Sequence, residues 1–243
     1  LSALTLPALE VVGGSLEVVD CDDLHTIDLP NLIAVHGALR VLDNLDLTAL
    51  ELPALTTLGG NLKVEENDKL TAIDLPGLPA LGGGLSVEGQ VLATLQLPLL
   101  AHVASYVHLE SNPFLDTAAL PQLASVGSAL KIYENDALPS LALPALQSVG
   151  THLDVLGNDM LATISTPALQ QVGGDMEIYK NNALPTVEFP ALASVGGEFN
   201  VYSNDTLGGV SFPALAGIDG SMLVYQNALM VAFELPALTA HEA

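Results

Sequence analysis

The chain has 243 residues, and 28 Asp and Glu against 5 Lys and Arg give it a formal net charge of −23. Half of its residues are hydrophobic, which excludes a disordered chain, and its one Cys excludes a scaffold built on disulfides. Five cations are too few for a basic stripe that would neutralise phosphates, so the composition argues against nucleic-acid binding.

Prolines recur along the chain with a period of 23 residues, shortened once to 22 between Pro76 and Pro98. The repeat unit reads L-x-x-L-x-L-P-A-L-x-x-V-G-G-x-L-x-V-x-x-N-D-x, and its positions are numbered 1 to 23 below. Ten full units and a partial eleventh begin at residues 1, 24, 47, 70, 92, 115, 138, 161, 184, 207 and 230. A fixed period over the whole chain predicts a single repeat domain, residues 1–243.

Each unit, followed from its start, predicts two short strands and two turns. Apolar residues alternate at positions 4 and 6 and again at 16 and 18, as in strands, while Pro at 7 and Gly at 13 and 14 are turn residues. One unit cannot bury its apolar side alone, but stacked units that pair in parallel can. We predict an all-β fold, a right-handed parallel β-solenoid of ten full coils and a partial eleventh. Its thin core is expected to consist of aliphatic columns with no room for large rings.

Position 21 carries Asn in eight of the ten full units: Asn44, Asn67, Asn112, Asn135, Asn158, Asn181, Asn204 and Asn227. The other two units have Cys21 and Gln90 there. Because a buried amide must be hydrogen-bonded, we predict a ladder of stacked Asn side chains at this turn. Cys21 is then a small buried replacement rather than a reactive thiol.

The run L-P-A-L-x-x-V-G-G-x-L-x-V-x-x-N-D-x-L, as in Leu143 to Leu161 or Phe189 to Leu207, resembles leucine-rich repeats of the receptor L-domain type. It is also similar to bacterial surface leucine-rich repeats of the BspA kind. The resemblance implies a secreted or cell-surface protein used for adhesion, recognition or wall organisation. The chain departs from receptor L domains by its regularity and by the absence of disulfide caps.

Outward positions 17 and 19 of the second strand predict where such a protein binds. Four of the five Tyr lie in column 19, which also holds Leu156, and column 17 beside it supplies hydrogen-bonding groups. Tyr offers rigid area and a hydroxyl, which suit a protein or carbohydrate ligand. Stacked Tyr side chains also stabilise a plain β-ladder, so the structural interpretation stays open. The candidate ligand-binding residues are Tyr133, Leu156, Tyr179, Tyr202, Tyr225, Glu177 and Asn200.

Other functions have weaker support in the sequence. The six His fall at different repeat positions and catalytic motifs are absent, so we predict no enzyme, no cofactor and no metal site. Asp22, Asp68, Asp136, Asp159 and Asp205 follow the Asn column, and turn formation explains them better than calcium does.

Two alternatives accompany the recognition hypothesis. One is a structural wall or envelope component, and the other is ice binding, suggested by the column-3 series Thr94, Thr117, Ser140, Thr163 and Thr186. Self-association of the rod, end to end or side by side, is a further expected contact. The uncharged stretch 89–109 contains Pro98 and fits the repeat, so we predict no transmembrane segment.

Overall fold

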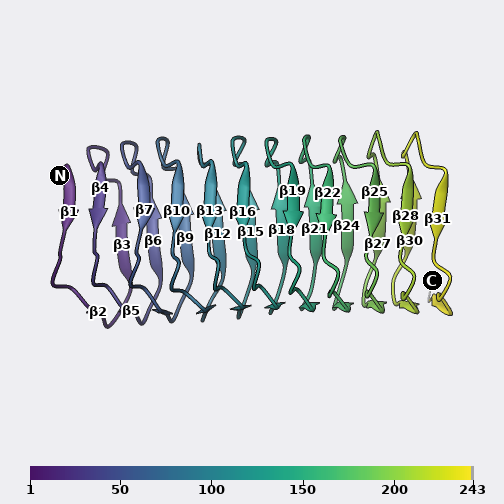
Figure 1. Cartoon of the computed structure of the whole chain (residues 1–243), viewed down its shortest axis with the longest axis horizontal. Coiled ribbons are helices and arrows are strands. Elements are labelled where there is room, and N and C mark those ends of the chain that lie inside the picture. The colour runs from purple at the N-terminus through teal and green to yellow at the C-terminus, as the bar shows by residue number, and fades with distance from the viewer. Residues whose placement is uncertain (242–243) are drawn as a thin grey trace.

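The structure, a computed structural model, describes residues 1–241 and is a parallel β-solenoid whose coils stack along one axis (Figure 1). The described residues contain no helix, and therefore none that is long and apolar enough to cross a membrane. Each coil pairs with the next in parallel and in register, residue for residue. The solenoid predicted from the repeat is confirmed.

Each full coil contributes three strands, not two. Sheet I consists of positions 16–19: β3 Leu16–Val19, β6 Leu39–Leu42, β9 Leu62–Glu65, β12 Leu85–Glu88, β15 Val107–Glu110, β18 Leu130–Tyr133, β21 Leu153–Leu156, β24 Met176–Tyr179, β27 Phe199–Tyr202 and β30 Met222–Tyr225. Sheet II consists of positions 11–12: β2 Val11–Val12, β5 Ala34–Val35, β8 Thr57–Leu58, β11 Ala80–Leu81, β14 His102–Val103, β17 Ser125–Val126, β20 Ser148–Val149, β23 Gln171–Val172, β26 Ser194–Val195, β29 Gly217–Ile218 and β32 Ala240–His241. The two-strand prediction was wrong because a strand of two residues shows no alternation in the sequence.

Sheet III, made of positions 3–5, is divided into four groups of paired strands. The groups are β1 Ala3–Thr5 with β4 Thr26–Asp28; β7 Ala49–Glu51, β10 Ala72–Asp74, β13 Thr94–Gln96 and β16 Thr117–Ala119; β19 Ser140–Ala142 with β22 Thr163–Ser165; and β25 Thr186–Glu188, β28 Gly209–Ser211 and β31 Ala232–Glu234. Sheets I and II run unbroken past the same coils, so the divisions open one side of the solenoid only.

The core lies between the three sheets and is aliphatic along most of the chain. Its exception is a group of three fully buried rings, Phe189, Phe199 and Phe212. The Phe189 and Phe212 rings stack with centroids 5.2 Å apart, and Phe199 meets Phe212 edge-on at 5.0 Å. The expectation that large rings have no room was therefore wrong. Stacking in register lets rings of successive coils pack against each other, which the composition of a single coil does not reveal.

The predicted Asn ladder is confirmed and is fully buried from Asn44 to Asn204, apart from Gln90 at 1% exposure. Asn158 is typical: its Nδ2 donates to the carbonyl oxygens of Ile132 at 2.9 Å and Leu156 at 3.0 Å, and to Asn181 Oδ1 at 3.1 Å. The residue before each ladder position has a left-handed backbone, with φ from 52° to 68° in all ten full coils. Cys21 is only half-buried, and its backbone N–H donates to Asn44 Oδ1 at 3.2 Å.

Candidate binding surface

The structure places all seven predicted site residues on the outer side of sheet I. In-register pairing aligns Tyr133, Leu156, Tyr179, Tyr202 and Tyr225 in one column across β18, β21, β24, β27 and β30. The same pairing aligns Glu177 and Asn200 in the neighbouring column, after Lys131 and Asp154. The residues therefore form one continuous surface, here called the Tyr face.

Three of the four Tyr rings form a stack. Tyr179 and Tyr202 have centroids 4.5 Å apart and an interplanar angle of 12°, and Tyr202 and Tyr225 are 4.8 Å apart at 3°. Rings stacked in this way cover each other's faces and leave their edges and hydroxyls outward. Tyr225, which lies nearest the C-terminal end, is 45% exposed. The stack is a rigid contact area with a row of hydroxyl groups.

Tyr133 belongs to a separate cluster, because Leu156 lies between it and the stack. Its hydroxyl donates to Asp154 Oδ2 at 2.9 Å, and Lys131 Nζ lies 3.7 Å from the same oxygen. Lys131 Nζ also lies 5.5 Å from the centre of the Tyr133 ring. Asp154, which is only 7% exposed, thus accepts one hydrogen bond and forms an ion pair with Lys131.

Asn200 is the most informative polar residue of the Tyr face. It is 5% exposed, and its Nδ2 donates to Glu177 Oε1 and Glu198 Oε2, both at 3.1 Å. Among residues 1–241, no group donates to its Oδ1, which is buried. An acceptor buried without a donor is costly, and a ligand donor would remove that cost. Repeat position alone could not identify this atom, because the neighbouring carboxylates decide which way the amide points.

Burial raises the pKa of the Tyr133, Tyr179 and Tyr202 phenols above the ordinary value of 10.0. The carboxylate of Asp154 adds to the effect on Tyr133, and its neighbour Tyr179 adds to the effect on Tyr202. The three hydroxyls therefore keep their protons at neutral and mildly alkaline pH. A protonated phenol can donate a hydrogen bond over that whole range, as Tyr133 does to Asp154.

The Glu65, Glu88 and Glu110 series in column 19 brings like charges together on β9, β12 and β15. Lys63 Nζ pairs with Glu65 Oε2 at 2.5 Å, which offsets one end of the series. Burial, and then the charges of Glu110 and Glu65, raise the pKa of Glu88 above 4.5. The folded protein thus binds a proton at Glu88 more readily than the unfolded chain does, so ionised Glu88 opposes folding at neutral pH.

We expect Glu88→Gln to raise the Tm at pH 7, because it removes a charge that folding disfavours. The advantage over the wild type should shrink as the pH falls toward 4.5, where Glu88 becomes protonated and its penalty disappears. Thermal unfolding followed by circular dichroism from pH 7 to 4.5 measures both effects. Glu10→Gln changes an exposed carboxylate outside the series and is the control. A gain that is the same at both pH values would contradict this explanation.

No group of three or more His, Cys, Asp or Glu is placed to hold a metal ion in the described part of the chain. Comparison with protein-family models, with curated proteins and with solved structures found no match. The resemblance to receptor L-domain repeats therefore stays a prediction, and function has to be argued from the surface itself.

Proposed function

We propose that the chain is a non-catalytic recognition or adhesion module that works at the cell surface or outside the cell and binds a protein through the Tyr face. The observation that carries the proposal is the rigid stack Tyr179–Tyr202–Tyr225. Beside it lies the column that contains Asn200, whose Oδ1 has no hydrogen-bond donor among the described residues. Tyr side chains lose little conformational entropy on binding, and these three lose still less because they are already stacked.

The geometry favours a protein over a carbohydrate at this surface. At an aromatic surface a sugar ring would stack on the open face of a side-chain ring, whereas Tyr202 has a ring on either side. The outward groups are hydroxyls and the carboxylate of Glu177, beside the acceptor Asn200 Oδ1. With a net charge of −23 on the chain, the best partner surface is one rich in N–H donors, including Lys and Arg.

Ice binding is less well supported than recognition. A flat and regular array of hydroxyls would be needed, but the column-3 series from Thr94 to Thr186 crosses two divisions of sheet III. The pairing of β16 with β19, and of β22 with β25, is absent from the described residues. A structural role in a wall or envelope gives no reason for a buried Asn200 Oδ1 without a hydrogen-bond donor.

The test is an array of extracellular proteins and glycans probed with the full chain. We expect selective protein binding that falls at least about tenfold when Tyr179, Tyr202 and Tyr225 are all replaced by Ala, because anchoring aromatic residues dominate such interfaces. Changing the same three residues to Phe keeps the stack and removes the hydroxyls, which separates contact area from hydrogen bonding. Tyr106→Ala, at the Tyr outside the column, is the control. Binding that survives the triple Ala change would sink the assignment of the Tyr face.

A further inference from the structure

The division of sheet III between β22 and β25 has an identifiable chemical cause at one end. In most coils the N–H at position 2 donates to the preceding coil, as Ala162 does to the Pro139 carbonyl oxygen at 3.0 Å and Gly208 to that of Pro185 at 2.8 Å. Pro185 occupies position 2 of its own coil and has no N–H to donate. The Ala162 carbonyl oxygen therefore lacks its ladder donor.

The other end of the same division is open as well. At position 6 the N–H normally donates to the next coil, as Leu143 does to Ser165 O at 2.9 Å and Phe189 to Ser211 O at 3.2 Å. Within the described chain, Thr166 makes no such bond to Glu188. Unpaired backbone groups thus line both ends of the gap, and a buried polar group without a partner costs stability.

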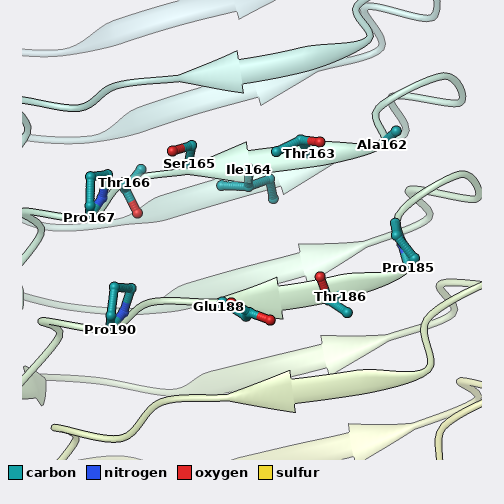
Figure 2. Close-up of a pocket in the computed structure, with 10 residues that line it drawn as sticks. All are labelled: Ala162, Thr163, Ile164, Ser165, Thr166, Pro167, Pro185, Thr186, Glu188 and Pro190. Atoms are coloured by element: carbon teal, nitrogen blue, oxygen red, sulfur yellow. The ribbon is translucent and has the colours of Figure 1, made fainter.

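Between β22 and β25 lies a slot of about 380 Å³ (Figure 2). Hydroxyl and carboxylate groups line it: Thr163, Ser165, Thr166, Thr186 and Glu188. Three prolines, at 167, 185 and 190, supply apolar surface at its two ends. No Lys, Arg or His is among the described residues that line the slot. The lining therefore suits a neutral ligand with many hydroxyls and does not suit an anion.

Thr166 gives independent evidence that the slot accepts a ligand. Position 6 is Leu or Phe in every other unit, and Thr166 is the one polar residue of the column. It is 2% exposed, and its Oγ1 has no hydrogen-bond partner among residues 1–241. Figure 2 shows this hydroxyl on the side of the chain toward the next coil. A hydroxyl so placed is satisfied by a group that enters the slot.

The division between β16 and β19 serves as an internal comparison. It also has a proline at position 2, Pro139, but its position-6 residues are Leu120 and Leu143 and its position-5 residues are Ala119 and Ala142. Proline therefore removes a ladder donor in both places, whereas the division between β4 and β7 has Thr48 at position 2. The gap between β4 and β7 also has hydroxyls and a carboxylate, from Thr26, Thr48 and Glu51. Among the described residues, the gap beside β22 differs from both others by a buried polar side chain without a partner, Thr166.

We propose that this slot binds a small neutral carbohydrate, a mono- or disaccharide, independently of the Tyr face. Its volume lies near the lower end of the range of about 300–1,000 Å³ that is usual for ligand sites, which matches one or two sugar rings. Ser, Thr and Glu side chains, together with the open backbone groups of Ala162 and Thr166, would replace the water bound to sugar hydroxyls. The proline rings would contact the C–H faces of the sugar.

The experiment titrates the full chain with glucose, mannose, N-acetylglucosamine, maltose and cellobiose, followed by calorimetry and by amide shifts in ¹⁵N-labelled protein. We expect at least one sugar to bind saturably, with the shifts concentrated in β22 and β25. Thr166→Val removes the hydroxyl at nearly constant shape and should weaken binding about tenfold, as for one lost hydrogen bond to a buried group. Thr166→Leu, which restores the residue typical of the column, should abolish binding.

Controls separate this role from a structural one. Thr117→Val alters column 3 on β16, away from the slot, and should leave the affinity unchanged. Both Thr166 variants should unfold at or above the temperature of the wild type, since they remove an unpaired hydroxyl. Saturable binding that is insensitive to Thr166→Val, or shifts confined to sheet I, would overturn the proposal. So would the absence of saturable binding by all five sugars, whatever the outcome at the Tyr face.

Discussion

Asn158→Ala should lower the free energy of unfolding by at least about 3 kcal/mol, because it removes the five hydrogen bonds that this side chain makes within the ladder, at about 0.5–1.5 kcal/mol each. The carbonyl oxygens of Ile132 and Leu156 lose the donor Nδ2, although Leu156 still accepts from the Glu134 N–H, and the Asn135 N–H loses the acceptor Oδ1, 3.0 Å away. The cavity left by the amide adds to the loss. Because the ladder is continuous on both sides of this coil, the effect is expected to spread to its neighbours.

Chemical denaturation monitored by circular dichroism measures this loss, and hydrogen exchange locates it. Asn182→Ala is the matched control, because this neighbouring Asn is partly exposed and its Nδ2 donates to Asp159 Oδ1, 3.0 Å away. It should change the free energy of unfolding by no more than about 0.5 kcal/mol. Equal effects of the two substitutions would show that the ladder contributes no special stability. Asn158→Gln should recover part of the loss, since Gln90 occupies the column naturally.

The repeat made the architecture and the buried ladder predictable from the sequence. Residue types that recur at one position in most coils, such as the Asn of the ladder and the Leu of the core, are visible in the sequence because each coil has to bury the same groups. The Tyr face could also be located, since in-register stacking turns sequence position 19 into a straight column.

Features that depend on single deviations from the repeat could not be placed. The open ladder beside β22 lies next to Pro185 and Thr166, which the sequence does not show to border the same gap. The buried Phe189, Phe199 and Phe212 were missed for a similar reason: they lie at two different repeat positions and meet only across coils. A prediction based on the repeat describes the average coil, so it misses contacts between residues that differ from that average.

Phe212→Ala is the second substitution expected to have a large effect, lowering the free energy of unfolding by about 3–5 kcal/mol. Phe212 is fully buried and contacts the rings of Phe189 and Phe199, so its removal leaves a cavity between coils and breaks both aromatic contacts. Each coil of a solenoid is stabilised mainly by its immediate neighbours. The loss should therefore be local, with the coils after residue 207 opening before the rest.

Hydrogen exchange of the variant tests that locality, because it reports protection coil by coil. We expect faster exchange in β28, β30 and β31 and nearly unchanged protection in β9 and β12, together with a broader unfolding transition. Phe114→Ala is the control, since this ring is 60% exposed and should cost no more than about 0.5 kcal/mol. Uniformly faster exchange along the whole chain would mean that the solenoid unfolds as one unit. In that case the three rings would stabilise the entire rod, and Asn158→Ala and Phe212→Ala would have the same exchange pattern.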